Sequence, residues 1–291
     1  MKFWQSIFLC EGDQIVDTVK IVDNLGFEGA MISEHLLHIE DREPAYPYSE
    51  DGQPPQFTDK TVYPECWSLM AALAAVTDNL RFVTNVFILP LHHPIEVAKA
   101  TGSVAYFSDN RIILGAGAGW MKEEFDILGV DFASRGKRYD ECIEIIRLLQ
   151  TGERVEYHGQ HFEFSPVQMC PAPTQPVPIY IGGISGPALR RTARVGDGWL
   201  GPGQTLDDAL ATVKKIHALR EEYGRSSEPF EMIVPIYGEM TIDDFKRMED
   251  AGVDGTVSLP FAITMKPNTT LEQKRAYLEN YAENIIAKVN R

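Results

Sequence analysis

Hydrophobic positions along the chain form two kinds of segment that alternate. Short runs of large aliphatic and aromatic residues, such as 2–9 and 111–114, are typical of strands buried on both faces of a parallel sheet. Between these runs lie longer segments whose apolar residues recur at helical spacing, as at Ile15, Val19 and Val22. The pattern therefore predicts a chain of alternating strands and helices.

Each predicted strand is followed by a helical pattern. The strands cover 2–9, 27–33, 80–89, 111–114, 179–181, 198–200, 231–236 and 253–259. The helices cover 14–25, 63–77, 94–107, 134–149, 188–195, 206–222 and 242–251, and a last helix carries Leu278, Tyr281, Ile285 and Val289. Eight such units in 291 residues predict an α/β protein with a (β/α)8 TIM barrel, and a doubly wound sheet is the alternative.

Two segments interrupt the alternation. A polar, proline-rich loop at 39–61 follows the second strand, and a small hairpin is predicted at 151–165, before the fifth strand. A loop of this length inside a compact domain is typical of a lid or wall over a site. Since no repeat or break in composition marks a boundary, we expect residues 1–291 to form a single domain.

The charge balance narrows the possible partners. The chain has 27 Lys and Arg against 42 Asp and Glu, a formal net charge of −15, which repels nucleic acid and anionic membranes. A small-molecule enzyme is therefore favoured. An anionic cofactor would have to be held by local N–H groups and helix dipoles.

Cysteine usage and the first residues indicate a cytoplasmic protein. The four cysteines, Cys10, Cys66, Cys142 and Cys170, form no C-x-x-C pair, so neither a disulfide framework nor a zinc knuckle is expected. The chain enters its first predicted strand without the pattern of a signal peptide.

Glycines gather at the carboxyl ends of two predicted strands. Gly115, Gly117 and Gly119 precede Trp120, and the segment 182–186 precedes a helix with Pro187 in its first turn. Glycine lets backbone N–H groups approach a phosphate or a flat ring, although it also relieves crowding at a strand end. The G-x-G-x-G spacing after the fourth strand does not match the Rossmann fingerprint, which argues against a classical NAD site.

His35 ends the second predicted strand, where an imidazole can donate a proton to a reacting group; a purely structural role is the alternative. Its neighbour Glu34 could polarise it or contact the same ligand. His38, His92 and His93 lack the spacing of a metal motif, so no metal site is expected. The pair Glu123–Glu124 could supply general acids, but it is interpreted as solvated partners of the helix dipole in a first helical turn.

Several blocks together identify a family. They are SEH at 33–35, AYPYS at 45–49, LPLHHP at 89–94, RIILGAGAGWMKEEFDILGV at 111–130, RGKRYDE at 135–141 and PIYIGGISGPALRRTARVGDGW at 178–199. With these blocks the chain resembles the bacterial luciferase-like superfamily of flavin- and deazaflavin-dependent oxidoreductases. It looks most like the branch described as probable coenzyme F420-dependent oxidoreductases.

The resemblance implies a (β/α)8 barrel that holds a flavin or a deazaflavin across its carboxyl-end rim. It implies catalytic roles for His35, beside the reacting ring carbon, and for Glu34, as an acidic contact of the ring. Asn85 and Val86 match a bulge, often with a non-proline cis peptide, that backs the ring. Ala118 stands where relatives often carry a threonine or arginine that helps to hold phosphate, so phosphate binding there would use the backbone only or be weaker. The cofactor-binding residues expected from the resemblance are Asn85, Val86, Gly115, Gly117, Ala118, Gly119, Trp120, Gly182, Gly183, Ile184, Ser185 and Gly186.

These observations predict an oxidoreductase that transfers a hydride between coenzyme F420 and a small organic substrate. An FMN-dependent luciferase-like monooxygenase that uses O2 is the alternative within the family. From other classes, a non-catalytic ligand-binding barrel or a metal hydrolase stays open.

The substrate side of the site is predicted from aromatic and apolar residues, which favour an apolar or ring-bearing molecule; packing in the core is their alternative role. These residues are Phe8, Leu37, Phe57, Trp120 and Trp199. A homodimer is expected only from the habit of the family.

Overall fold

The computed structural model describes residues 1–43, 46–49, 52–53 and 58–291. Within these residues the main sheet is parallel and has the order β3-β2-β1-β11-β10-β9-β8-β5-β4, and pairing of β3 with β5 closes it into a barrel. The strands are β1 Lys2–Ser6, β2 Gly29–Ile32, β3 Arg81–Thr84, β4 Phe87–Ile88, β5 Ile112–Gly117, β8 Ile179–Gly182, β9 Gly198–Leu200, β10 Glu231–Ile233 and β11 Gly255–Ser258. Since β4 continues β3 after a short break, the described chain forms an eight-stranded barrel, and the predicted (β/α)8 fold is confirmed.

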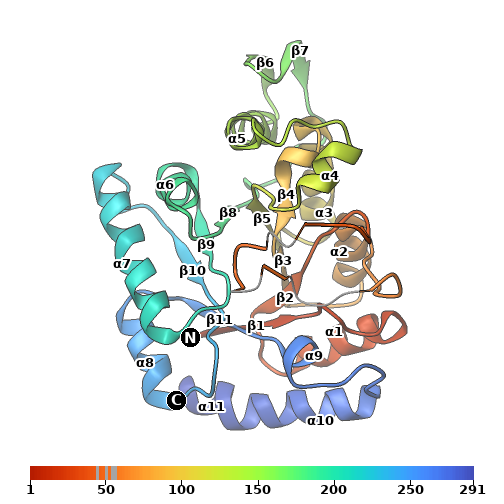
Figure 1. Ribbon diagram of the computed structural model, residues 1–291, viewed down its shortest axis with the longest axis vertical. Helices are drawn as coiled ribbons and strands as arrows, with labels where there is room; N and C mark the ends of the chain where they lie inside the picture. The colour runs from red at the N-terminus through yellow and green to blue at the C-terminus, as the bar shows by residue number, and fades with distance from the viewer. Residues whose placement is uncertain (44–45, 50–51, 54–57) are drawn as a thin grey trace.

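Helices surround the barrel (Figure 1). They are α1 Ile15–Asn24, α2 Cys66–Ala74, α3 Pro94–Phe107, α4 Lys122–Ile127, α5 Arg135–Gln150, α6 Gly186–Val195, α7 Leu206–Glu222, α8 Ile242–Asp250, α9 Pro260–Ile263, α10 Leu271–Tyr281 and α11 Ala287–Val289. Short 3-10 segments occupy Gly12–Gln14 and Leu89–Leu91, and a π-helical turn at Ala282–Ile286 joins α10 to α11. No helix of the described residues is both long and apolar enough to cross a membrane.

The small hairpin is present before the fifth barrel strand. Its strands are β6 Arg154–His158 and β7 Glu163–Gln168, which pair antiparallel. The hairpin projects beyond α5 at the top of the view (Figure 1). The second strand of the hairpin, β7, ends at Gln168, three residues after the end of the predicted hairpin at 151–165.

Several element boundaries differ from the sequence prediction, and two of them have a clear local cause. The first strand ends at Ser6 rather than near residue 9, and Leu9 has a positive φ of 62°, which no strand residue adopts. The helix predicted from Tyr63 begins at Cys66, because the carboxylate of Glu65 accepts hydrogen bonds from the first free N–H groups, those of Trp67 and Ser68.

The third predicted strand, 80–89, is divided into β3 and β4. The division falls at the Asn85–Val86 peptide bond, which is cis. This is the bond that the family resemblance had marked.

One side chain from each barrel strand fills the centre of the barrel. These are Trp4, Met31, Val83, Ile113, Tyr180, Leu200, Ile233 and Val257, which form one buried cluster. Side chains alternate along a strand, so the next inward position toward the amino end is Lys2 on β1, Arg81 on β3 and Glu231 on β10. This end of the barrel is therefore closed by charged groups.

The inward positions toward the carboxyl end are smaller on one side of the barrel. After the central cluster, the same alternation gives Ser6, Gly115 and Gly182 on β1, β5 and β8, and Ser33 and Asn85 directly after β2 and β3. The carboxyl end of this half of the barrel carries no large inward side chain at these positions. It is the place where active sites of (β/α)8 barrels lie.

Candidate functional site

Val86 lies between the two glycine-bearing strand ends. A Cβ placed on Gly117 of β5 would lie 2.6 Å from Val86 Cγ2, and one on Gly182 of β8 would lie 2.7 Å from Val86 Cγ1. A Cβ on Gly115 would lie 1.9 Å from the carbonyl oxygen of Thr84. These three glycines therefore make room for the chain itself, which is the crowded-strand-end alternative, and Val86 forms a floor shared by both strand ends.

His35 lies beyond the end of β2, at the same rim. Its Nδ1 is 3.3 Å and 3.2 Å from the two carboxylate oxygens of Glu124, and its side chain is 13% exposed. The ring contacts two aromatic rings edge to face, Tyr63 at 5.9 Å and Trp120 at 6.0 Å between centroids. The imidazole is thus held by a carboxylate and two rings but is still accessible.

We call residues 115–119 the first glycine turn and residues 182–186 the second. A row of aromatic side chains continues from Trp120 to the second glycine turn. Trp120 packs edge to face on Tyr46, and Tyr46 packs in the same way on Tyr48, both at 5.3 Å between centroids. The hydroxyl of Tyr48 lies 3.2 Å from the position of a Cβ on Gly183, which has a φ of +104°. We call the set Tyr63, His35, Trp120, Tyr46 and Tyr48 the aromatic wall.

The tyrosines of this wall are neutral at physiological pH. Burial, together with the neighbouring hydroxyls of Tyr48 and Tyr237, raises the pKa of Tyr46 to about 12. Burial, followed by the charge of Glu124, raises the pKa of Tyr63 further above its ordinary value. Since both hydroxyls keep their protons, they can donate hydrogen bonds to a ligand.

The second glycine turn leads into α6. Ser185 caps this helix, because its hydroxyl accepts a hydrogen bond from the N–H of Ala188 at 3.3 Å. Ile184 and Ser185 are exposed, and Arg190 places its guanidinium 3.3 Å from the position of a Cβ on Gly186. Within the described chain no hydrogen bond or ion pair engages Arg190, so a cation and a positive helix end lie together.

Glu34 faces a different neighbour from His35. Its Oε2 accepts a hydrogen bond from the N–H of Ile88 at 2.7 Å, and its Oε1 lies 2.9 Å from Nε2 of His92 without the angle of a hydrogen bond. His93 caps α3 by accepting from the N–H of Ile95. Among the described residues, no three or more His, Cys, Asp or Glu side chains gather as a metal site would require.

Glu124 is the residue that the sequence interpretation missed. It was expected to be solvated, but its side chain is 0% exposed and contacts His35. The signal lies in α4 and the residue before it, because Met121, Glu124 and Phe125 are all buried and follow the i, i+3, i+4 spacing of one helix face.

The predicted substrate pocket is only partly assembled. Trp120 is in the aromatic wall, and Phe8 packs against Tyr63 at 5.7 Å. Trp199 does not belong to it: the side chain is 0% exposed, packs in the core outside the barrel, and donates from Nε1 to the carbonyl oxygen of Gly183 at 2.9 Å. Leu37 is 42% exposed, and Phe57 lies outside the described residues.

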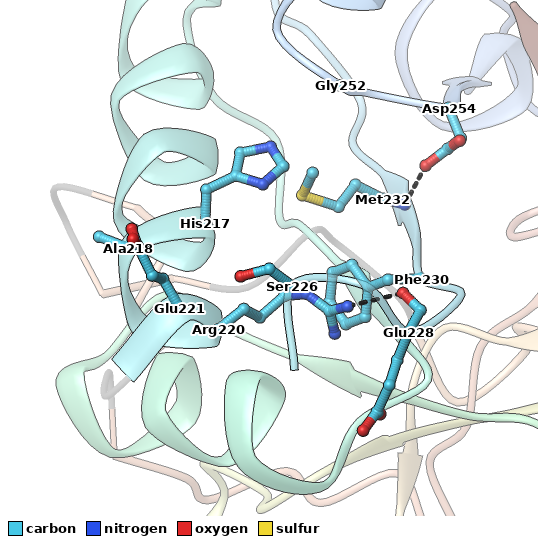
Figure 2. Close-up of a pocket in the computed structure, with 10 residues that line it drawn as sticks. All are labelled: His217, Ala218, Arg220, Glu221, Ser226, Glu228, Phe230, Met232, Gly252 and Asp254. Carbon is cyan, nitrogen blue, oxygen red and sulfur yellow. Dashed lines mark hydrogen bonds between the residues drawn. The ribbon is translucent and has the colours of Figure 1, made fainter. Parts of the chain in front are cut away.

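A cavity of about 450 Å³ lies at the other end of the barrel (Figure 2). Figure 2 shows Arg220 of α7 beside Phe230, close to the amino ends of β10 and β11. The Arg220 side chain donates to the carbonyl oxygens of Arg225 and Glu228 at 2.6 Å and 2.9 Å, so it fastens the segment that follows α7. This cavity is remote from His35 and from both glycine turns.

Comparisons with known proteins identify the family of the chain. A family model described as "Luciferase-like monooxygenase" matches residues 11–282. An uncharacterised protein of Mycobacterium tuberculosis is 42% identical over 276 residues, which cover 94% of this chain and 95% of that protein. A 5,10-methylenetetrahydromethanopterin reductase of Archaeoglobus fulgidus is 28% identical over 259 residues, 88% of this chain and 68% of the reductase.

Among solved structures, the coenzyme F420-dependent tetrahydromethanopterin reductase of Methanopyrus kandleri has the same fold. The TM-score is 0.77 at 15% sequence identity, with 99% of each chain covered. At this identity the likeness concerns the fold alone.

Proposed function

Because the chain belongs to the luciferase-like monooxygenase family, we propose that it is an oxidoreductase that moves a hydride between coenzyme F420 and a small organic substrate. The observation that carries this proposal is the convergence of His35, Trp120 and the turn at Gly183 on one rim of the barrel, joined by the aromatic wall. The family match over residues 11–282 gives it further support.

The residues at the rim fit a cofactor with a flat ring and an anionic tail. Val86 provides an apolar floor, and Trp120, Tyr46 and Tyr48 provide aromatic surface. The two tyrosines also provide neutral hydroxyls. A phosphate would fit at the start of α6, where it would meet the N–H groups of Ser185 and Gly186 and the guanidinium of Arg190. The remaining predicted contacts, Asn85, Gly115, Gly117, Ala118, Gly119, Gly182, Gly183 and Ile184, would act through their backbone or by allowing this close packing.

A bound reduced deazaflavin would supply the hydride. The chain would supply the rest: it orients the ring, excludes water with the aromatic wall, and moves the proton that accompanies the hydride. We assign that proton to His35, because its imidazole packs on Trp120 at the rim and its Nδ1 is already engaged by Glu124. Glu34 would hold the break between β3 and β4, behind the cofactor ring, through its hydrogen bond from the N–H of Ile88.

The test begins with cofactor content. The protein is produced in a host that makes coenzyme F420, and the released cofactor is identified by its absorbance and fluorescence. We expect a deazaflavin. Recovery of tightly bound metal without a flavin or deazaflavin would instead support the hydrolase alternative.

The role of His35 is tested by His35→Ala. Turnover should fall about 100-fold or more, the range lost when a general acid is removed, while cofactor affinity stays nearly unchanged. His158→Ala is the matched control, since His158 is an exposed histidine of the hairpin that pairs only with Glu163 in the described structure. An unchanged rate in His35→Ala would remove this residue from the mechanism.

An FMN-dependent monooxygenase is the second candidate, and the name of the family favours it. Loading the protein with FMN and measuring substrate-dependent O2 consumption separates the two. Substrate-dependent O2 uptake with FMN, and no turnover with coenzyme F420, would replace the first proposal.

A further inference from the structure

Glu124 is a buried carboxylate that the proposed reaction does not yet use. It lies in the first turn of α4, four residues after Trp120, and its side chain is fully buried. An ionised carboxylate in such a place is costly unless hydrogen-bond donors surround it. The donors present are Nδ1 of His35 and the backbone N–H of Leu36.

The hydrogen bonds of Glu124 define which nitrogen of His35 carries a proton. Both carboxylate oxygens lie within 3.3 Å of Nδ1, and an ionised carboxylate only accepts hydrogen bonds. The proton between the two groups must therefore sit on Nδ1. The nitrogen whose protonation can change is then Nε2.

We propose that Glu124 is the positioning residue of His35: it fixes the orientation of the ring and keeps the proton on Nδ1, so that Nε2 is the atom that exchanges the proton in the reaction. The arrangement follows the logic by which a buried carboxylate holds a catalytic histidine in the correct tautomer. This inference rests on the proposed function, because it gives a purpose to a histidine that acts as a proton donor or acceptor.

The geometry makes a sharp prediction for Glu124→Gln. Oε1 of Glu124 accepts a hydrogen bond from the N–H of Leu36 at 3.1 Å, so in the variant the amide oxygen keeps this place. The amide NH2 then takes the position of Oε2, 3.2 Å from Nδ1, where it is a donor. The amide oxygen, 3.3 Å from Nδ1 and already accepting from Leu36, is then the one acceptor that Glu124→Gln leaves for Nδ1–H, while the NH2 repels it. This change favours the tautomer with the proton of His35 on Nε2.

The experiment is nitrogen-15 NMR of the imidazole rings in the cofactor-free protein at alkaline pH, where imidazoles are neutral. The resonances of His35 are assigned by their loss in His35→Ala. We expect Nδ1–H in the unmodified protein and in Glu123→Gln, and Nε2–H in Glu124→Gln. Glu123 is the matched control, because its carboxylate faces the N–H of Glu43 instead.

Turnover of the loaded enzyme gives a second readout. Glu124→Gln should lower kcat about 10- to 100-fold with little change in KM, the range typical when the partner of an active histidine is removed. Glu124→Asp, which keeps the carboxylate, should keep the tautomer and restore part of kcat.

Two results would overturn the proposal: a proton on Nε2 of His35 in the unmodified protein, or a proton that stays on Nδ1 in Glu124→Gln. The first needs no variant, so the inference is tested even where Glu124→Gln does not fold. Failure of the proposed function looks different, since His35→Ala would then keep its turnover while Glu124→Gln still changed the tautomer.

Discussion

The charged amino end of the barrel offers a stability test that is independent of the site. Glu231 accepts hydrogen bonds from the hydroxyl of Tyr180, from Lys2 Nζ at 2.9 Å, and from Arg81 Nη1 at 3.3 Å and 3.5 Å. Arg81 also lies over the ring of Trp4, 5.4 Å from its centroid. Glu231→Gln removes the negative charge at the centre of this network and leaves its size unchanged.

The cost of this change can be bounded. Removing one partner of a fully buried ion pair costs roughly 3–5 kcal/mol. Here Glu28 remains 2.7 Å from Arg81 and 3.9 Å from Lys2, and the Lys2 side chain is 41% exposed, so both cations keep some compensation. We expect a loss of about 2–3 kcal/mol in the free energy of unfolding and a fall of roughly 4–6 °C in Tm.

The loss should depend on pH. Burial by itself raises the pKa of Glu231, but the hydrogen bond from Tyr180 and the charges of Arg81 and Lys2 outweigh it and hold the pKa below its ordinary value of 4.5. A carboxyl with a lowered folded-state pKa stabilises the fold above its unfolded pKa and loses this effect as the pH falls through the folded one. The difference between the unmodified protein and Glu231→Gln should be full at neutral pH and shrink below about pH 4.5.

Urea unfolding at a series of pH values, followed by circular dichroism, measures the difference directly. Glu163→Gln is the control, since this side chain is 77% exposed on the hairpin and should change stability by less than about 0.5 kcal/mol. A Glu231→Gln protein as stable as the control at pH 7, or a difference that grows toward low pH, would refute the reasoning.

Two further predictions concern the rim. Gly117→Ala places a Cβ 2.6 Å from Val86 Cγ2, and valine is stiff at χ1, so we expect the free energy of unfolding to fall by about 1–3 kcal/mol in a thermal melt and cofactor binding to weaken. Adding Val86→Ala to the same chain should restore the stability. Without this rescue, Val86 would not be the neighbour that causes the loss. Arg190→Met removes the cation beside Gly186, which should weaken cofactor affinity about 10-fold by fluorescence titration while kcat at saturating cofactor stays the same; equal affinity would show that Arg190 does not meet the anionic end.

The alternation of strands and helices could be predicted because its signals are local. Each barrel strand is a short apolar run, and each helix shows its own spacing, so neither depends on what packs against it. Which side chains face the centre of the barrel could not be predicted in this way. Trp199 and Leu200 are adjacent apolar residues of β9, yet Leu200 faces the barrel centre and Trp199 the outer core. Which of them faces inward is set by the register with β8 and β10, which the sequence does not display.

The site shows the same limit. That His35 and the glycine turns lie at one rim could be predicted because the carboxyl ends of barrel strands meet there, a rule that needs no contact information. Glu124 could not be assigned in this way, since its partner lies 89 residues away in the chain. Tyr46 and Tyr48 come from an irregular loop that has no periodic pattern, so their packing on Trp120 appears only in the folded chain.

The two ends of the barrel hold their cations differently, and under the proposed function this difference would let so acidic a chain bind an anionic cofactor. At the amino end, Lys2 and Arg81 are held by Glu28 and Glu231, so these cations are unavailable to any ligand. At the carboxyl end, Arg190 has no such partner in the described chain and lies beside a positive helix end. A net charge of −15 repels anions at long range, but salt screens that field within about 10 Å. Local cations and N–H groups then decide what binds. Raising the ionic strength should therefore increase the association rate of the cofactor and weaken its contact with Arg190 in the complex. In the unmodified protein we expect the association rate of the cofactor to rise with salt concentration while its equilibrium affinity falls. In Arg190→Met the affinity should fall less steeply with salt concentration.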